Sequence, residues 1–129
     1  MQEVLLLSGA GQIGMAIARR VGAGKKIVVG DKNPANADAI ATILQNAGFD
    51  AVATEMDLAS RASIKRMIAQ AQQMGDITML VNAAGVSPSQ APIETILKVD
   101  LYGTAVLLEE VGQMIVDAIH KGCRRFIMG

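Results

Sequence analysis

Short aliphatic runs alternate along the chain with longer segments whose apolar residues recur every three or four positions. The short runs are typical of buried strands, and the longer segments are typical of amphipathic helices. The pattern predicts five strands: Glu3–Ser8, Lys26–Gly30, Ala51–Met56, Ile77–Asn82 and Arg124–Met128. It predicts helices at Gln12–Val21, Asn36–Asn46, Arg61–Met74 and, over a longer stretch, about Leu97–His120.

Local signals at the ends of these elements agree with the pattern. Gly48 follows the second predicted helix, where glycine commonly ends helices, and Ser60 precedes the third as a candidate N-cap. Strands that alternate with helices imply right-handed crossovers and a mostly parallel sheet covered on both faces. We therefore expect one domain over residues 1–129, a doubly wound α/β fold of the Rossmann type. Ligands of such sheets bind beyond the carboxyl ends of the strands.

Composition narrows the function classes. The chain has 129 residues, of which 51% are hydrophobic and 2% aromatic, so the core must be aliphatic. The formal net charge is zero, which argues against a nucleic-acid partner and against docking on acidic lipid. No apolar run is long enough to span a membrane. The single cysteine, Cys123, excludes an internal disulfide and a multi-cysteine zinc site, and it favours a cytoplasmic protein with no metal site.

A glycine cluster follows the first predicted strand and opens the first predicted helix. It has the form Gly9-x-Gly11-x-x-Gly14, with Gln12 and Ile13 in the first helical turn. Gly9 can make a tight turn, Gly11 lets backbone approach a pyrophosphate, and Gly14 lets the helix pack close to the sheet. The free amides of the helix would face the anion. The alternative interpretation is a glycine-rich turn that binds no ligand.

An acidic residue follows the second predicted strand. Asp31 lies 22 residues after Gly9, where a carboxylate can bind both ribose hydroxyls of an adenosine and would repel a 2′-phosphate. The neighbouring Lys32 could instead neutralise such a phosphate. The sequence "DKNP" is also turn chemistry, so a capping role is the alternative. The pattern favours NAD over NADP.

The third and fourth strands also end in candidate contacts. Asp57 could accept a hydrogen bond from an adenine amino group while the Leu58 amide donates to the ring, or it could simply support the helix that begins near Ser60. At the end of the fourth strand, the side-chain amide of Asn82 can bond across strand ends. The small residues Ala83, Ala84 and Gly85 that follow leave room for a ribose.

Together these motifs resemble the short-chain dehydrogenase/reductase family. The glycine turn, Asp31, "MDLAS" and "NAAG" fall in that family's order, and "LKVDLYGT" over residues 97–104 is similar to its "VNLxG" stretch. The resemblance covers the whole chain but only the front half of a typical member. It implies a nicotinamide dinucleotide cofactor and hydride transfer between that cofactor and an alcohol or ketone.

The chain departs from the family in three ways. Its glycine turn is one residue shorter than the family's, and Asp100 occupies the place of a catalytic Asn. The family's catalytic Ser and Tyr-x-x-x-Lys pair are absent, because the one tyrosine, Tyr102, is followed four residues later by Val106. We therefore expect no catalytic residues and a truncated product that binds the cofactor without turnover. His120 and Cys123 are interpreted as structural.

Two other functions stay open from the sequence. One is a non-enzymatic module that senses NAD or holds a protein partner through the long helix. The other is an S-adenosylmethionine-dependent methyltransferase, although "NAAG" and the lack of an acidic residue just before Gly9 argue against it. The resemblance also implies a homo-oligomer, formed through the helix at residues 97–120 or through an exposed sheet edge. An apolar stripe marks that helix: Leu101, Ala105, Leu108, Val111, Ile115 and Ile119.

Overall fold

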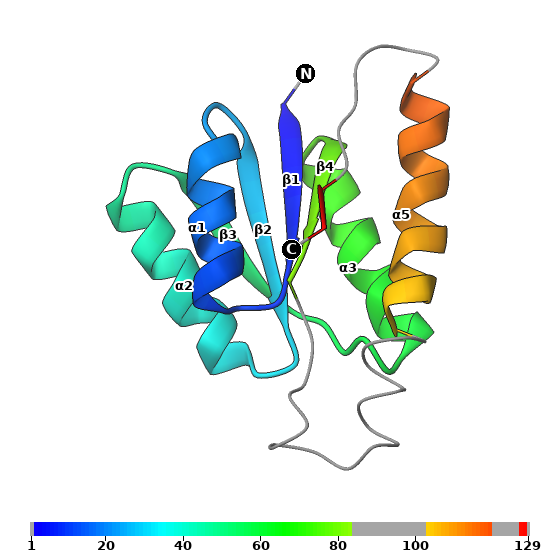
Figure 1. The fold of residues 1–129 in the computed structure, drawn as a ribbon, viewed down its shortest axis with the longest axis horizontal. Coiled ribbons are helices and arrows are strands. Elements are labelled where there is room, and N and C mark those ends of the chain that lie inside the picture. The colour runs from blue at the N-terminus through cyan, green and yellow to red at the C-terminus, as the bar shows by residue number, and fades with distance from the viewer. Residues whose placement is uncertain (1, 84–102, 120–126, 129) are drawn as a thin grey trace.

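A single parallel sheet forms the centre of the protein. The computed structural model describes residues 2–83, 103–119 and 127–128. The strands lie in the order β3-β2-β1-β4-β5, and every pairing is parallel (Figure 1). Their bounds are β1 Glu3–Ser8, β2 Lys26–Asp31, β3 Asp50–Glu55, β4 Asp76–Asn82 and β5 Ile127–Met128. The predicted doubly wound α/β fold is confirmed.

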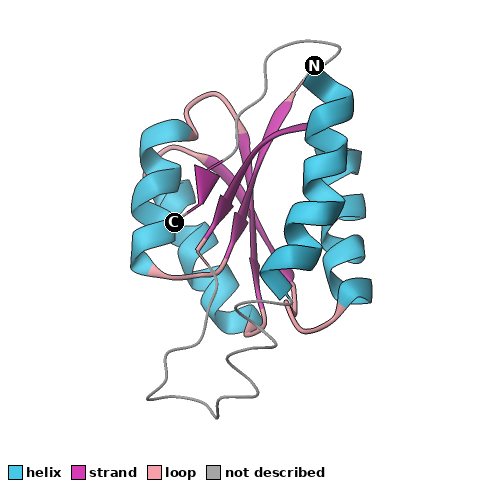
Figure 2. Cartoon of the chain, turned by 45° about the vertical axis from the view of Figure 1, so that its right-hand side comes forward, coloured by secondary structure: helices cyan, strands magenta, loops and turns pink. Residues whose placement is uncertain are grey.

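Helices cover both faces of the sheet, so the molecule has three layers (Figure 2). In Figure 1, α1 (Gln12–Val21) and α2 (Pro34–Asn46) lie on one side, and α3 (Arg61–Met74) and α5 (Thr104–Ile119) on the other. Alternate residues of β1 enter the two cores. Leu5 and Leu7 join the cluster that includes Ala18 of α1, whereas Leu6 joins the cluster that includes Val111 of α5. Because both faces are buried, β1 is apolar without alternation.

The side of the sheet to which the chain adds strands changes at β1. The chain adds β2 and β3 on one side of β1, then crosses over to place β4 on the other side. Ser8, the last residue of β1, is in register with Gly30 of β2 and with Asn82 of β4. The carboxyl ends of three neighbouring strands therefore meet at the topological switch point, where ligands of such sheets bind.

Most predicted element bounds agree with the structure, and the differences have local causes. Helix α2 begins at Pro34 instead of Asn36, because the Asn33 Oδ1 accepts the Ala35 amide at 3.0 Å and proline suits a first helical position. Strand β2 extends to Asp31, which pairs with Glu55. Residues 97–102 and 120 of the predicted long helix and residues 124–126 of the last predicted strand lie outside the described residues.

Both predicted helix-end signals are present. Gly48 follows α2 with a φ of 93°, a left-handed conformation that favours glycine. The Ser60 hydroxyl caps α3 by accepting the Ser63 amide at 3.2 Å. Helices α3 and α5 are further joined by an ion pair between Arg61 and Glu110 at 2.6 Å.

Two kinds of feature are not found within the described ranges. None of the helices there combines the length and the apolar character needed to cross a bilayer. No group of three or more His, Cys, Asp or Glu side chains in the same residues could hold a metal ion.

Candidate functional site

Glycine residues form the turn from β1 into α1. Gly9 has a φ of 103°, which side-chain-bearing residues rarely adopt, and its amide donates to the Gly30 carbonyl at 2.7 Å. This bond fixes the turn to the end of β2. Gly11 then serves as the N-cap of α1 in an extended conformation, and no side chain caps the helix. Among the described residues, no side chain takes up the first amides of α1, which have no partner within the helix and are a position where anions bind.

Gly11 and Gly14 differ in what surrounds them. A Cβ at Gly11 would meet no atom of the described residues within 4 Å, so these residues leave the space over the turn open. A Cβ at Gly14 would lie 2.9 Å from both the Ala83 Cβ and the Leu7 Cδ1. Gly14 thus allows α1 to pack closely on β1 and the end of β4, while Gly11 leaves room for an approaching group. Between them, Gln12 is exposed and Ile13 is 73% exposed.

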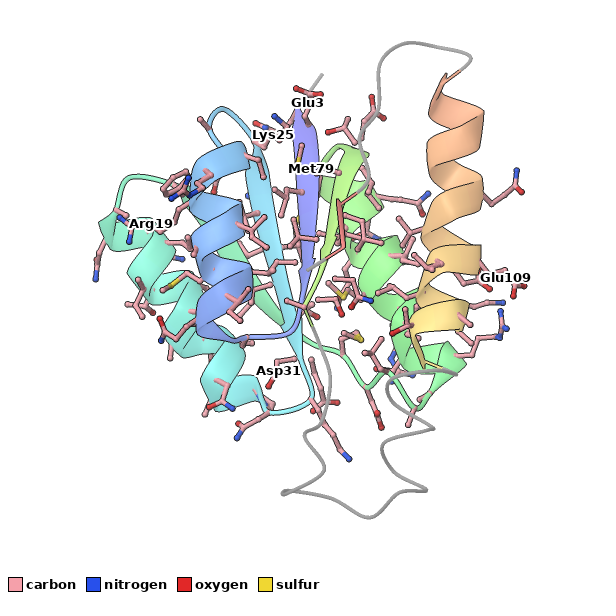
Figure 3. The ribbon with its side chains drawn as sticks, viewed as in Figure 1. Glu3, Arg19, Lys25, Asp31, Met79 and Glu109 are labelled. Carbon is pink, nitrogen blue, oxygen red and sulfur yellow. The ribbon has the colours of Figure 1, made fainter. Side chains whose placement is uncertain are left out.

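Asp31 lies beside this turn at the end of β2 (Figure 3). Its Oδ1 accepts the Ala10 amide at 3.3 Å, and its Oδ2 accepts the Asn33 amide at 3.1 Å. The second bond is the turn chemistry that "DKNP" indicates. The first joins Asp31 to the glycine cluster, so the structure brings these two candidate features together. The side chain is half-buried, and the neighbouring Lys32 is exposed.

Asp57 and Leu58 are engaged in local structure. The Asp57 Oδ1 accepts the Ala59 amide at 2.9 Å, and the Asp57 amide donates to the Ser63 Oγ at 2.8 Å. Leu58 is 4% exposed, and its side chain belongs to the core under α3 and α5. The interpretation of Asp57 as support for the start of α3 thus has direct contacts behind it. The adenine contacts expected of the Asp57 carboxylate and the Leu58 amide stay predictions.

The end of β4 is bonded toward α5. Asn82 is 3% exposed, and its Nδ2 donates to the Thr104 Oγ1 at 3.4 Å. We expected this amide to bond across strand ends, and its described bond goes to the first turn of α5 instead. The bond across the strand ends is made by backbone, since the Ala83 amide donates to the Ser8 carbonyl at 2.8 Å.

Two buried polar atoms at these strand ends have no hydrogen-bond partner among the residues that the structure describes: the Ser8 Oγ and the Asn82 Oδ1. The other predicted residues of this region, Ala84, Gly85 and Asp100, lie outside the described residues.

Sequence reasoning missed two contributors to the site. Ala10 presents a backbone amide to Asp31, and a backbone donor leaves no residue-type signal. The Ser63 hydroxyl accepts the Asp57 amide. The available signal was the presence of this second serine three residues after the predicted cap Ser60.

Comparison with known proteins identifies the family. The family model described as short chain dehydrogenase matches residues 2–122. The chain belongs to the short-chain dehydrogenase family. Among curated relatives, a short-chain dehydrogenase/reductase of Alternaria brassicicola is 37% identical over 114 residues, covering 88% of this chain and 42% of the relative. An uncharacterized oxidoreductase of Bacillus subtilis is 36% identical over 95 residues, covering 72% of this chain and 37% of that protein.

Solved structures of other proteins share the fold. An actinorhodin polyketide ketoreductase variant with NADPH superposes with a TM-score of 0.83 at 25% identity, covering 98% of this chain and 52% of that chain. A short-chain dehydrogenase/reductase from Burkholderia phymatum in complex with NAD also gives 0.83, at 19% identity, covering 98% and 48%. The present chain thus spans about half the length of these structures, and less than half of the curated relatives named above.

Proposed function

We propose that this chain binds a nicotinamide dinucleotide, with the pyrophosphate over the turn from β1 into α1. The observation that carries the proposal is the start of α1, where Gly11 caps the helix without a side chain and faces open space. Uncapped amides and the positive end of the helix dipole bind anions at such positions. The family match and the NAD- and NADPH-bound structural neighbours support the same assignment.

The adenosine ribose would meet Asp31. This carboxylate lies beside the turn and uses one acceptor position of each oxygen for the Ala10 and Asn33 amides. A carboxylate oxygen has two such positions, so both oxygens can still accept from ribose hydroxyls. A 2′-phosphate would place a like charge against Asp31, which favours NAD over NADP. Lys32, exposed next to Asp31, is the residue that would oppose this preference.

When bound, the nicotinamide ring would supply or accept a hydride, and an alcohol or ketone is the substrate class the family implies. In such chemistry this chain's own residues would bind and orient the dinucleotide. General acid–base transfer by the family's Tyr–Lys pair has no counterpart here, since Tyr102 is the only tyrosine and Val106 follows it four residues later. We infer that the 129-residue chain alone binds the cofactor without turnover.

Self-association through α5 is a separate proposal, and the burial of this helix limits which of its residues could contact a second copy. Val111, one of the residues of the predicted apolar stripe, is fully buried against the core, so it does not face a partner. Ala105 is exposed and Leu108 is half-buried. Leu101 and the side chains of Ile115 and Ile119 lie outside the described residues. A homo-oligomer through α5 would therefore use the exposed side of the helix.

Thermal unfolding with three ligands tests the proposed function. NAD at 100 times its dissociation constant should stabilise the fold by about 2.7 kcal/mol. NADP should stabilise it less, and S-adenosylmethionine, included for the methyltransferase alternative, should not stabilise it at all. Equal shifts with NAD and NADP would contradict the assignment of Asp31. A shift with S-adenosylmethionine alone would contradict the cofactor class.

A further inference from the structure

The Asp31 carboxylate lies between two backbone amides that come from different elements. The Oδ1 atom accepts from Ala10, within the glycine turn 21 residues earlier, and the Oδ2 atom accepts from Asn33, two residues later. A residue that served only to meet a ligand would need neither bond. The arrangement instead makes Asp31 a link between the end of β2 and the turn that begins α1.

The link starts from a fixed point. The Asp31 carbonyl accepts the Met56 amide at 3.0 Å, and Asp31 is in register with Glu55 at the end of β3. The glycine turn is joined to β2 by one backbone hydrogen bond. Gly9 donates to the Gly30 carbonyl, and Gly11 contributes no capping side chain. Within the described residues, the bond from the Ala10 amide to Asp31 is thus the side-chain hydrogen bond that restrains the turn between these two glycines.

We propose that Asp31 is a positioning residue of the glycine turn as well as the ribose contact, so that one carboxylate couples ribose recognition to pyrophosphate binding. The proposal rests on the proposed function and adds to it a structural cost for NADP. A 2′-phosphate that pushed the carboxylate aside would break its bond to the Ala10 amide. The turn that binds the pyrophosphate would then lose its restraint. Discrimination against NADP therefore comes from two sources, charge repulsion and loss of order in the turn.

The first test needs no ligand. Hydrogen exchange of the Ala10 amide is measured by NMR in the unliganded wild-type chain and in Asp31→Ala, Asp31→Asn and Asn33→Ala. The control Asn33→Ala removes the side chain that caps Ala35 but keeps the backbone amide that donates to Asp31. We expect the Ala10 amide to exchange about tenfold faster in Asp31→Ala, as for loss of a hydrogen bond to a charged group. Asp31→Asn, which keeps one carbonyl acceptor, should be intermediate, and Asn33→Ala should match the wild type at Ala10.

The second test separates positioning from ribose recognition. Calorimetry compares NAD with 2′,3′-dideoxyadenosine 5′-diphosphate, a probe whose ribose offers Asp31 no hydroxyl. If Asp31 positions the turn, Asp31→Ala weakens the dideoxy probe by about fivefold, because a hydrogen bond that orders the turn is lost. NAD should be weakened further, since the ribose bonds are lost as well.

Two results would overturn the positioning role. One is an Ala10 exchange rate in both Asp31 variants that equals the wild-type rate. The other is an Asp31→Ala variant that binds the dideoxy probe with wild-type affinity. Failure of NAD to bind the wild-type chain would refute the proposed function, whereas the exchange rates would still decide whether Asp31 holds the turn. A variant that melts near the assay temperature is replaced by Asp31→Asn, which preserves the side-chain volume.

Discussion

Two turns in this protein connect a strand to a helix at the same edge of the sheet, yet they differ in what they leave unbonded. In the turn from β3 into α3, side chains accept three backbone amides: Asp57 accepts from Ala59, Ser60 accepts from Ser63, and the Ser63 hydroxyl accepts from Asp57. In the turn from β1 into α1, the N-cap is Gly11 and no side chain caps the helix. We call the β3–α3 turn, whose helix has a side-chain cap, the closed turn, and the β1–α1 turn, whose helix has none, the open turn.

Under the proposed function, this difference distinguishes the turn that binds a ligand from the turn that does not. A capping side chain stabilises its helix by about 1 kcal/mol and occupies the amides that an anion would need. Helices α2 and α3 have such caps, in Asn33 and Ser60. Helix α1 lacks one and is followed along the sheet edge by Asp31, whose carboxylate restrains the turn from outside. The open turn lacks the stability that a cap adds, and under the proposed function its amides bind the pyrophosphate.

Closing the open turn should have the largest effect. Gly11→Asp would place a capping carboxylate on α1, and Gly11 has a φ of −114°, which aspartate adopts without strain. We expect the unliganded chain to gain about 0.5 kcal/mol from the cap, as for other side-chain caps that replace glycine. NAD affinity should fall by about 100-fold or more, because like charges brought together cost several kcal/mol. Calorimetry and urea unfolding measure the two effects.

The matched control is Gly11→Val, which blocks the same open space with an apolar side chain and adds no charge. It should also lose NAD binding while remaining folded. Normal binding of NAD by both variants would mean that the cluster is only a turn.

Filling the tight position should act on stability instead. In Gly14→Ala, the new Cβ would lie 2.9 Å from the Ala83 Cβ and from the Leu7 Cδ1, so α1 must shift away from the sheet. Overpacking of this kind costs about 1–3 kcal/mol of unfolding free energy. Urea denaturation checks the loss. An unchanged midpoint would show that the close approach of α1 to the sheet is not a constraint on Gly14.

Opening the closed turn should have the smallest effect. Ser60→Ala removes the hydroxyl that caps α3 and should cost about 1 kcal/mol of unfolding free energy. NAD affinity should stay within twofold of the wild type once both proteins are measured well below their melting temperatures, because the cap lies on another turn. A larger loss of affinity would mean that the β3–α3 turn contributes to the site through its backbone geometry.

Local patterns in the sequence were sufficient for most of the fold. The bounds of β1, α1 and α3 follow from apolar spacing and end signals that lie within the elements themselves. The start of α2 was misplaced because Asn33 and Pro34, taken as a turn, are also an N-cap and a first helical residue. Strand β2 was one residue short, since Asp31 is held in the strand by its pairing with Glu55, a contact between distant segments.

The site was less predictable than the fold, because most of its hydrogen bonds join segments that are distant in the sequence. The types of Gly9, Gly11 and Asp31 identify the turn and the carboxylate, but the bond between Asp31 and the Ala10 amide involves a donor that every residue carries. The bond from Asn82 to Thr104 joins residues 22 positions apart and depends on where α5 docks. Residue types at strand ends therefore indicate where polar groups gather, but they do not identify the partner of each atom.

The measurement that tests the central claim most directly is an NMR titration of the wild-type chain with NAD, followed at the backbone amides. If the open turn binds the pyrophosphate, the largest shifts occur at Gly9 and at Gln12–Gly14, the first turn of α1. The amides of the first turn of α3, Arg61–Ser63, should move little, because Ser60 already caps that helix. Saturation with NAD that leaves the α1 amides unmoved, or that shifts the α3 amides more, would contradict the account.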